Sequence, residues 1–188
     1  MALLKIAEVG NPILRRRSRE VSREELLGPT MQTLIDDLIE TMRDADGAGI
    51  AAPQVHLPVR ICVIEIRPNH PRYPEKEPIP LTVLVNPVVT PTSDATLESF
   101  EGCLSVPNLR GRVRRHADIL VRFWDRAGQE REVRAHGIQA VTYQHECDHL
   151  DGRLFVDRVT DPTSFTTWRN YATFVKDSKD VAVPAAVR

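Results

Sequence analysis

The fold is decided around one stretch, Gly137-Ile-Gln-Ala-Val-Thr-Tyr-Gln-His-Glu-Cys-Asp-His-Leu150. Its apolar spacing and the stop signal at Gly152 predict a helix over this range. Residues four apart on a helix differ by about 40° around its axis, so the imidazoles of His145 and His149 point the same way. The two side chains can therefore bind one metal ion together. Glu146 lies next to that face, within reach of a water molecule on the metal.

The neighbours of the histidine pair indicate the environment of this helix face. Ile138 and Val141 lie on the same helical stripe as the two histidines, so we expect the pair to continue an apolar face into the interior. Cys147 lies about 200° around the axis from His145 and is expected to point away from the metal. A chance match to the motif, on a helix with two packed histidines, is the alternative interpretation.

Two histidines supply only half of a tetrahedral metal site. Zinc proteases with this motif take a third ligand from downstream, but Phe155 occupies the position of the later histidine and no glutamate follows Glu146. A downstream aspartate remains an alternative. Upstream, Cys62 lies in an apolar run and is interpreted as a small core residue. A thiolate at Cys103 would instead complete a Cys-His-His set with one position open for water, as in catalytic sites.

Two further helices are expected. Apolar residues at helical spacing after Gly28-Pro29 and before Asp46-Gly47 predict an N-terminal helix over residues 29–45. Asp161-Pro162 is a good helix start, and it predicts a C-terminal helix. The apolar side of that helix consists of Phe165, Trp168, Ala172 and Val175.

Short apolar runs predict the strands, at residues 60–66, at 81–85 with a stop at Asn86-Pro87, and in a hairpin of 118–124 and 129–135. The order of elements predicts an α+β fold, with mostly antiparallel sheets around the central metal-binding helix and a helix towards each end. We expect one domain over residues 1–188. The proline-rich residues 67–80 are expected to be a lid or a surface loop, and residues 177–188 a loose tail.

Composition excludes several classes of protein. The chain of 188 residues has a net charge of −1 and 27% charged residues, which gives no reason to expect a nucleic-acid binder or a polybasic membrane binder. It has no run of about 18 apolar residues, so no membrane span is expected. Its first residues resemble neither a signal nor a transit peptide, which predicts a cytoplasmic protein. Three cysteines are an odd and sparse set, which gives no reason to expect a disulfide framework.

Three segments stand out when they are taken together: Gly47-Ala-Gly-Ile-Ala-Ala-Pro-Gln54, Glu101-Gly-Cys-Leu-Ser105 and Gln144-His-Glu-Cys-Asp-His-Leu150. In order and spacing they resemble the three signature motifs of the peptide deformylase family. Val9-Gly-Asn-Pro-Ile-Leu14 is also similar to the family's opening segment, so the resemblance covers most of the chain. Many members have proline where this chain has Arg114, a departure that we expect to change substrate contacts without touching the metal.

The resemblance implies an enzyme that removes the formyl group from N-formylmethionine of newly synthesised polypeptides and releases formate. It also implies a role for each motif residue. The metal ligands would be Cys103, His145 and His149, and Glu146 would be the general acid/base for a metal-bound water. Gln54 and the backbone N–H of Leu104 would stabilise the oxyanion. Gly49 would bind the substrate backbone, with Arg110 as a weaker candidate, and Ile50 and Val141 would help to line the methionine pocket.

The metal and the partners are also implied rather than read from the residues. Ligand rules alone favour zinc for a Cys-His-His site, whereas the resemblance implies Fe2+, with Zn2+, Ni2+ or Co2+ able to substitute, and we expect iron. The expected partners are N-formylmethionyl nascent peptides near the ribosome exit. Two alternatives are a zinc endopeptidase that shares only the helix motif and a non-catalytic metal-binding or ribosome-associated protein. The presence of Glu146 and Gln54 counts against the second.

Overall fold

The computed structural model describes residues 2–70, 72 and 77–176. The expected tail at 177–188 lies outside this range, as does part of the 67–80 segment. Within the described residues, no helix is both long and apolar enough to cross a bilayer.

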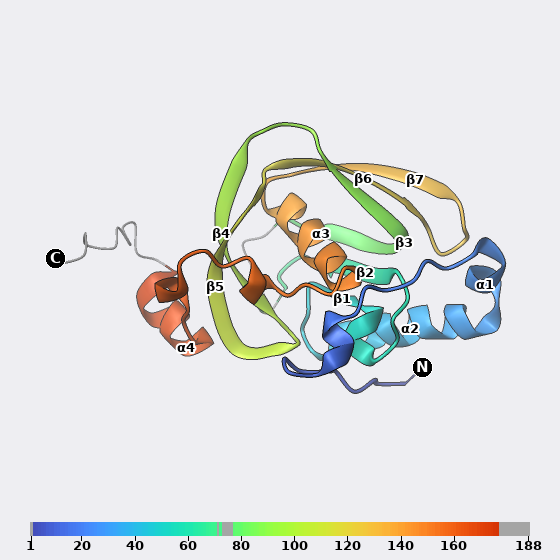
Figure 1. The fold of residues 1–188 in the computed structure, drawn as a ribbon, viewed down its shortest axis with the longest axis horizontal. Coiled ribbons are helices and arrows are strands. Elements are labelled where there is room, and N and C mark those ends of the chain that lie inside the picture. Colours follow the sequence, from blue (N-terminus) through green and yellow to red (C-terminus); the bar gives the residue numbers. More distant parts are fainter. Residues whose placement is uncertain (1, 71, 73–76, 177–188) are drawn as a thin grey trace.

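Helix α3 (Gly137–Leu150) lies at the centre, with strands on both sides of it (Figure 1). A five-stranded antiparallel sheet has the order β1-β2-β3-β6-β7, and a separate antiparallel hairpin consists of β4 and β5. The strands are β1 (Gly49–Ala51), β2 (Ile61–Ile66), β3 (Ile79–Pro91), β4 (Thr96–Cys103), β5 (Val106–His116), β6 (Asp118–Trp124) and β7 (Glu130–His136). This arrangement confirms the predicted α+β class.

The other helices lie at the periphery of the molecule. They are α1 (Arg23–Leu27), α2 (Pro29–Asp44) and α4 (Trp168–Asn170), which a π-turn extends over Tyr171–Val175. Short 3-10 turns occupy Pro12–Arg15, Ala52–Val55, Phe155–Asp157 and Pro162–Ser164. In Figure 1, α2 lies below the five-stranded sheet and α4 lies beside β5.

Helix α2 confirms the prediction for residues 29–45. Gly28 caps its N-terminus and Pro29 occupies the first turn, where the missing N–H costs nothing. Its apolar face packs on β1 and β2 and forms one hydrophobic core, which includes the fully buried Leu38, Met42 and Ile50. This core supports β1 from the side opposite to α3.

Helix α3 is also present as predicted. However, the expectation that the face carrying Ile138, Val141 and the two histidines is buried along its whole length is wrong at the N-terminal end. Ile138 is 40% exposed, so the stripe that carries the histidines does not run into the core over its whole length. The core side of α3 is formed instead by Ala140, Tyr143 and Leu150, which pack in a second hydrophobic cluster with β2, β3 and β6. Because both sides of the helix pack on protein, it is held rigidly along most of its length.

Strand β3 does not stop at Asn86-Pro87. The strand continues to Pro91, and the register with β6 shifts between Val85 and Val88. Asn86 has a left-handed backbone (φ 50°), and its side chain accepts from the N–H of Val21 at 3.0 Å and donates to the carbonyl of Val21 at 2.8 Å. The predicted stop is therefore a β-bulge, whose side chain supplies local hydrogen bonds.

The predicted C-terminal helix is wrong in form. Asp161 does cap a helical start, but the turn ends after Pro162–Ser164. Thr166 then pairs with Arg110 of β5 through two backbone hydrogen bonds, Arg110 N–H to Thr166 O at 2.8 Å and Thr166 N–H to Arg110 O at 2.9 Å. Helical structure resumes only at Trp168, because this extended pairing interrupts it.

Candidate metal and catalytic site

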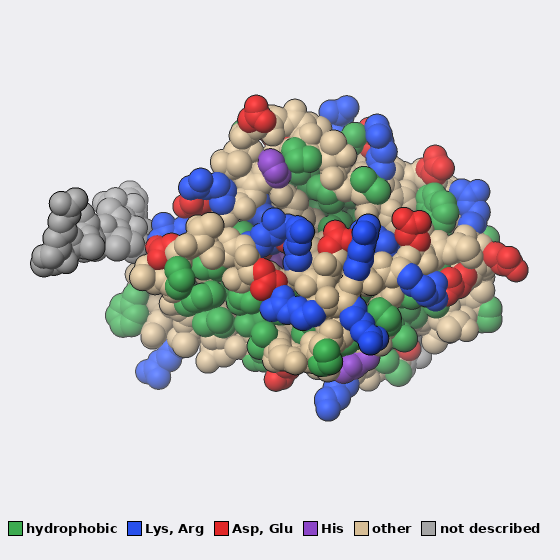
Figure 2. All heavy atoms as spheres, in the orientation of Figure 1, with side chains coloured by type: hydrophobic (Ala, Val, Ile, Leu, Met, Phe, Trp, Pro, Cys, Tyr) green, Lys and Arg blue, Asp and Glu red, His purple; other side chains and the backbone are tan. Residues whose placement is uncertain are grey.

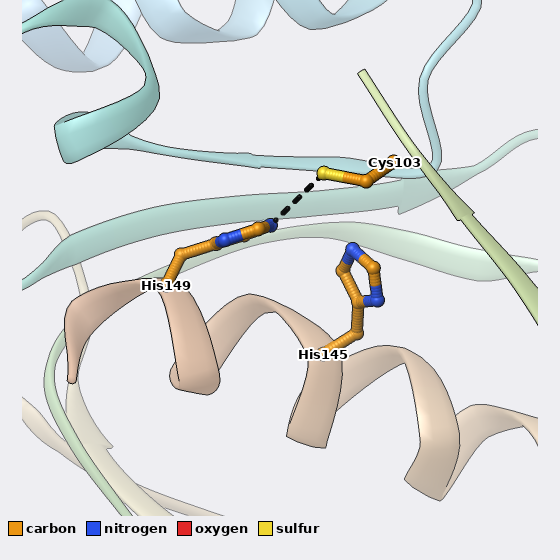
Figure 3. A group of neighbouring side chains, drawn as sticks. All are labelled: Cys103, His145 and His149. Atoms are coloured by element: carbon orange, nitrogen blue, oxygen red, sulfur yellow. Dashed lines mark hydrogen bonds between the residues drawn. The ribbon is translucent and has the colours of Figure 1, made fainter. Parts of the chain in front are cut away.

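The structure brings together Cys103, the last residue of β4, with His145 and His149 of α3 (Figure 3). One ligand atom from each lies within 4.8 Å of the others, and among the described residues these three form the group suited to a metal ion. Cys103 Sγ lies 3.4 Å from His149 Nε2, and the two imidazole rings are nearly perpendicular, at 87°. The three donors converge on one point between the hairpin and the helix.

The ionisation of Cys103 and the orientation of His145 fit a metal site. Burial raises the pKa of Cys103, but the neighbouring His149 and His145 outweigh it and lower this pKa to about 5. The thiol is therefore ready to bind as a thiolate, the form that ligates metals. His145 Nδ1 lies 2.7 Å from Glu101 Oε2, so its other ring nitrogen is left for the metal. This donor set, one thiolate and two imidazoles, fits a divalent transition metal.

A chain of ion pairs, buried at Arg115 and Glu101, lies behind His145. Arg115 donates to both carboxylate oxygens of Glu101, at 2.8 and 2.9 Å, and to Asp148 at 2.5 Å. Arg158 donates to both oxygens of Asp148, at 3.0 and 2.5 Å. Burial raises the pKa of Glu101, but the hydrogen bonds from Arg115 and His145 lower it to about 2. Glu101 is therefore ionised near neutral pH, and it fixes the tautomer and orientation of His145.

Glu146 lies beside the metal donors and has little charge compensation. It is buried, and its Oε2 has no hydrogen-bond partner. Burial raises its pKa, although the two histidines pull this pKa down. A Cβ atom at Gly49 would lie 2.5 Å from the Glu146 carboxyl carbon, so only glycine lets β1 pass the carboxylate here. A raised pKa and an unpartnered oxygen suit a group that accepts and returns a proton.

Gln54 faces the same donors from the 3-10 turn after β1. Its Oε1 accepts from Ala51 N–H at 2.9 Å, which fixes the direction of the amide. Its Nε2 donates to Ser105 Oγ at 3.0 Å and more weakly to Cys103 Sγ at 3.5 Å. Gln54 therefore presents an N–H₂ group toward the metal donors, held by bonds on both sides of the amide.

Most of the remaining predicted residues line one pocket, but one of them does not. Leu104, in the turn between β4 and β5, and Arg110 line the pocket with Gly49, Gln54 and Glu146. Ile50 does not, because its side chain is fully buried in the core against α2. Val141 lines the pocket as expected, together with Ile138. Cys147 points to the other side of α3, where its thiol raises the pKa of Cys62 through a hydrogen bond.

Sequence reasoning missed several residues of the site. Glu101 is the most important, and its position two residues before Cys103 was an available signal, since metal-binding histidines usually bond a carboxylate. Phe100, Arg72 and Trp168 also line the pocket, and no local pattern brings them together.

A second cleft lies on the opposite side of α3, lined by Gln144, Cys147 and Asp148 of that helix. Figure 2 shows Lys and Arg side chains gathered across one face of the molecule, with Asp and Glu side chains between them. The basic residues of this cleft are Arg17, Arg60, Arg114, Arg115, Arg153, Arg158 and His116. Most of the arginines pair with carboxylates, as Arg60 does with Asp151 at 2.7 Å. This cleft is therefore lined by paired charges, whereas the pocket described above is lined by metal donors and an unpartnered carboxyl.

A family model described as polypeptide deformylase matches residues 3–164. The chain belongs to this family. It is 43% identical to peptide deformylase 1A, chloroplastic/mitochondrial, of Arabidopsis thaliana over 89% of the chain and 65% of that protein. It is 41% identical to a peptide deformylase of Leptospira biflexa over 88% of the chain and 92% of that protein. The family resemblance seen in the three motifs is thus confirmed.

Solved structures of peptide deformylases share the fold. One from Acinetobacter baumannii, of class I type b and bound to Met-Ala-Ser, is 39% identical and superimposes with a TM-score of 0.80. The match covers 84% of this chain and 99% of that one. Because the likeness extends over most of the chain, the alternative of a zinc endopeptidase that shares only the helix motif does not describe this chain.

Proposed function

We propose that this deformylase-family chain is a metal-dependent hydrolase that removes the formyl group from N-formylmethionine of newly synthesised polypeptides and releases formate. The observation that carries the proposal is the convergence of Cys103, His145 and His149 beside a buried, unpartnered Glu146 in one pocket. The deformylase of Acinetobacter baumannii bound to Met-Ala-Ser supports the choice of a peptide that begins with methionine.

In this proposal, Cys103, His145 and His149 would hold the metal. When bound, it would supply Lewis-acid polarisation of the formyl carbonyl and acidification of a water molecule. We propose Fe2+ as the native ion, with Zn2+, Ni2+ or Co2+ as substitutes, in line with the family resemblance. The soft thiolate and the two imidazoles accept each of these ions, so their chemistry alone does not select among them.

Glu146 moves the proton. It accepts a proton from the attacking water and delivers it to the nitrogen of the leaving peptide, so that the formamide C–N bond breaks and formate and a free amine remain. Its raised pKa brings the group closer to neutral pH, where a carboxyl can perform both transfers. Gln54 N–H₂ and the backbone N–H of Leu104 donate to the oxygen that gains charge in the transition state.

The substrate backbone binds along β1. Among the strands of the described residues, β1 is the edge of the five-stranded sheet, so one side of it has no neighbouring strand there. Ala51 N–H points to Gln54 rather than into the sheet, and by alternation the N–H and C=O of Gly49 also face away from β2. An extended peptide can therefore pair with Gly49 by strand addition. The methionine side chain then contacts Val141 and Ile138, instead of the Ile50 that the sequence suggested.

We place the reaction in the cytoplasm, on nascent chains near the ribosome exit. The relative named chloroplastic/mitochondrial makes an organelle the alternative setting. Fractionation of the source cells, with the chain detected by a specific antibody, distinguishes the two settings.

The direct test of the activity uses formyl-Met-Ala-Ser and the chain freshly loaded with ferrous iron under anaerobic conditions. We expect stoichiometric formate and Met-Ala-Ser, and loss of activity after a chelator removes the metal. Acetyl-Met-Ala-Ser is the matched control, since it differs only in the acyl group. The proposal fails if the iron-loaded chain yields no formate, and cleavage of internal peptide bonds would indicate an endopeptidase instead.

A further inference from the structure

The C-terminal segment after the family match reaches into the catalytic pocket. The match ends at residue 164, yet Trp168 lines the pocket that contains His145 and Glu146. The two backbone hydrogen bonds between Thr166 and Arg110 attach this segment to β5. Trp168 thus adds to the pocket lining from beyond the range that the family model matches.

Trp168 is held in place by two close contacts. A Cβ atom at Gly102 would lie 3.1 Å from Trp168 Cζ2, so the indole covers the backbone next to Cys103. The guanidinium of Arg110 lies 4.1 Å from the Trp168 ring and 4.2 Å from the Tyr171 ring, and it also donates to the carbonyl of Phe100 at 3.4 Å. Arg110 is buried, and it joins two rings of the C-terminal segment to the hairpin.

A second guanidinium lies on the same indole. Arg72 is exposed, lines the pocket and lies 5.5 Å from the centre of the Trp168 ring. The carboxylate of Glu101, also in the pocket lining, already accepts from Arg115 and lies 2.7 Å from His145 Nδ1. The outer end of the pocket is therefore cationic and aromatic, while the inner end contains the metal donors and Glu146.

We propose that Arg72 and Trp168 form a subsite for a carboxylate on the substrate, downstream of its methionine, and that Arg110 positions the indole. This inference rests on the proposed function. A peptide with its formyl group at the metal donors extends along β1 toward the outer end of the pocket. A guanidinium oriented on an aromatic face binds a carboxylate there with little loss of side-chain freedom. The carboxylate comes from an acidic side chain or from the C-terminus of a short peptide.

The test compares formyl-Met-Ala-Glu-amide with formyl-Met-Ala-Gln-amide on the metal-loaded full chain. A partly exposed ion pair contributes little, so we expect a KM about threefold to fivefold lower for the glutamate peptide, with kcat unchanged. The preference should shrink as salt is raised. Formyl-Met-Ala-Gln as the free acid shows whether a C-terminal carboxylate serves equally. Equal KM values for the two amides would overturn the proposal.

Substitutions locate the effect. In Arg72→Gln and Trp168→Ala the ratio of the two KM values should fall to about one, and Trp168→Phe should retain part of it. Arg169→Gln is the matched control, since Arg169 is an exposed arginine of the same segment that does not line the pocket. A preference that survives in Arg72→Gln would contradict the proposal. Because each variant is judged by a ratio, a general loss of activity in Trp168→Ala does not affect the result.

A binding measurement separates failure of the subsite from failure of the proposed function. The chain has two tryptophans, so Trp124→Phe leaves Trp168 as the sole indole fluorophore. Titration with the deformylated peptides should change this fluorescence at about threefold to fivefold lower concentration for Met-Ala-Glu-amide than for Met-Ala-Gln-amide. This result would support the subsite even if no peptide released formate. Identical titrations would reject the subsite whether or not formate appears.

Discussion

The two clefts on opposite sides of α3 treat buried charge in opposite ways. We call the side of α3 that faces the second, arginine-lined cleft the arginine side, and the side that carries the three metal donors the metal side. On the arginine side, Asp148 accepts hydrogen bonds from both Arg115 and Arg158. On the metal side, Glu146 Oε2 and His149 Nδ1 are buried without a hydrogen-bond partner. Asp148 and His149 are adjacent on α3, but they face different sides of it. The charge of Asp148 is neutralised by two arginines, whereas His149 keeps an unsatisfied ring nitrogen.

The difference shows where the protein tolerates an energetic cost. An unpartnered buried polar group costs on the order of 1–3 kcal/mol, whereas the paired groups avoid that penalty. On the metal side the Glu146 carboxyl carries this cost, and the proposed proton transfer would require it, because the group must stay available to a water and a substrate. The arginine side supports the metal side through Glu101, which joins Arg115 to His145.

Removal of a metal ligand should give the largest effect. We expect Cys103→Ala to lose its metal and to show no measurable formate release, because two imidazoles alone hold a divalent ion weakly. Cys62→Ala is the matched control, since Cys62 is a buried cysteine of β2 that contacts Cys147 and does not line the pocket. Metal content by elemental analysis checks the prediction. Normal metal binding in Cys103→Ala together with loss in Cys62→Ala would show that the assigned thiolate ligand is wrong.

Glu146→Gln should give the next largest effect. We expect one metal per chain and a loss of about 10²–10⁴ in kcat, which is the usual contribution of a general acid/base. Because burial raises the pKa of Glu146 and the ionised form must accept the proton, wild-type kcat should fall with decreasing pH at a pKa above the ordinary carboxyl value. A pH–rate profile together with metal analysis tests both points. Loss of the metal from Glu146→Gln would contradict the proton-transfer role.

Gln54→Leu should reduce kcat/KM by about 10²–10³, because one oxyanion donor is removed. Ser105→Ala removes the partner that orients the Gln54 amide but leaves the amide itself, so we expect a loss of less than about tenfold. Steady-state kinetics with formyl-Met-Ala-Ser compares the two variants. Equal losses would mean that Gln54 acts mainly as a support for the loop at Ser105.

Glu101→Gln tests the link between the two clefts through stability. The pKa of Glu101 is about 2 in the folded chain and near 4.5 otherwise, so its ionisation stabilises the fold above pH 4.5. This contribution, about 3 kcal/mol at most, is lost as the pH falls from about 4.5 towards 2. Denaturant unfolding of Glu101→Gln should therefore depend less on pH in this window. Glu98→Gln, on the exposed side of the same strand, should retain the wild-type dependence.

The smallest effect is expected at the rim of the arginine cleft. Arg158→Ala removes two hydrogen bonds to Asp148, but Arg115 still compensates that carboxylate, so we expect about 1 kcal/mol of destabilisation and unchanged kcat. Arg114→Ala, an exposed ion pair with Glu98, should stay within about 0.5 kcal/mol of wild type. Chemical denaturation measures both. A large loss of kcat in Arg158→Ala would show that the arginine side takes part in catalysis.

The elements that were predicted well from the sequence are those whose pattern lies within the element itself and at its two ends. Helices α2 and α3 have apolar spacing together with start or stop residues, and their bounds agree with the prediction to within a residue. The hairpin of β4 and β5 was missed because ion pairs rather than apolar residues line part of it, as between Glu98 and Arg114. The prediction of a C-terminal helix was wrong because a capping residue such as Asp161 indicates only where a helix begins. The helix is then interrupted by the pairing of Thr166 with β5, which depends on residues far away in the sequence.

The site divides in the same way. His145, Glu146 and His149 could be placed from helix geometry alone, and Cys103 from the chemistry of the missing ligand. Ile50 was misplaced because adjacent residues of a strand point to opposite faces, and proximity to Gly49 in the sequence does not show which face is buried. Arg115, Asp148 and Trp168 meet the site only through the tertiary fold.

The position of Cys103 on a different element from the two histidines has a consequence for the lifetime of the folded chain. Cys103 and His149 are 46 residues apart, so their contact forms only when the hairpin docks on α3, late relative to contacts within the helix. A metal that needs all three donors binds the docked arrangement and not the open one. Such a ligand slows unfolding far more than it speeds folding. A metal held by all three donors would therefore also determine how seldom the hairpin separates from the helix.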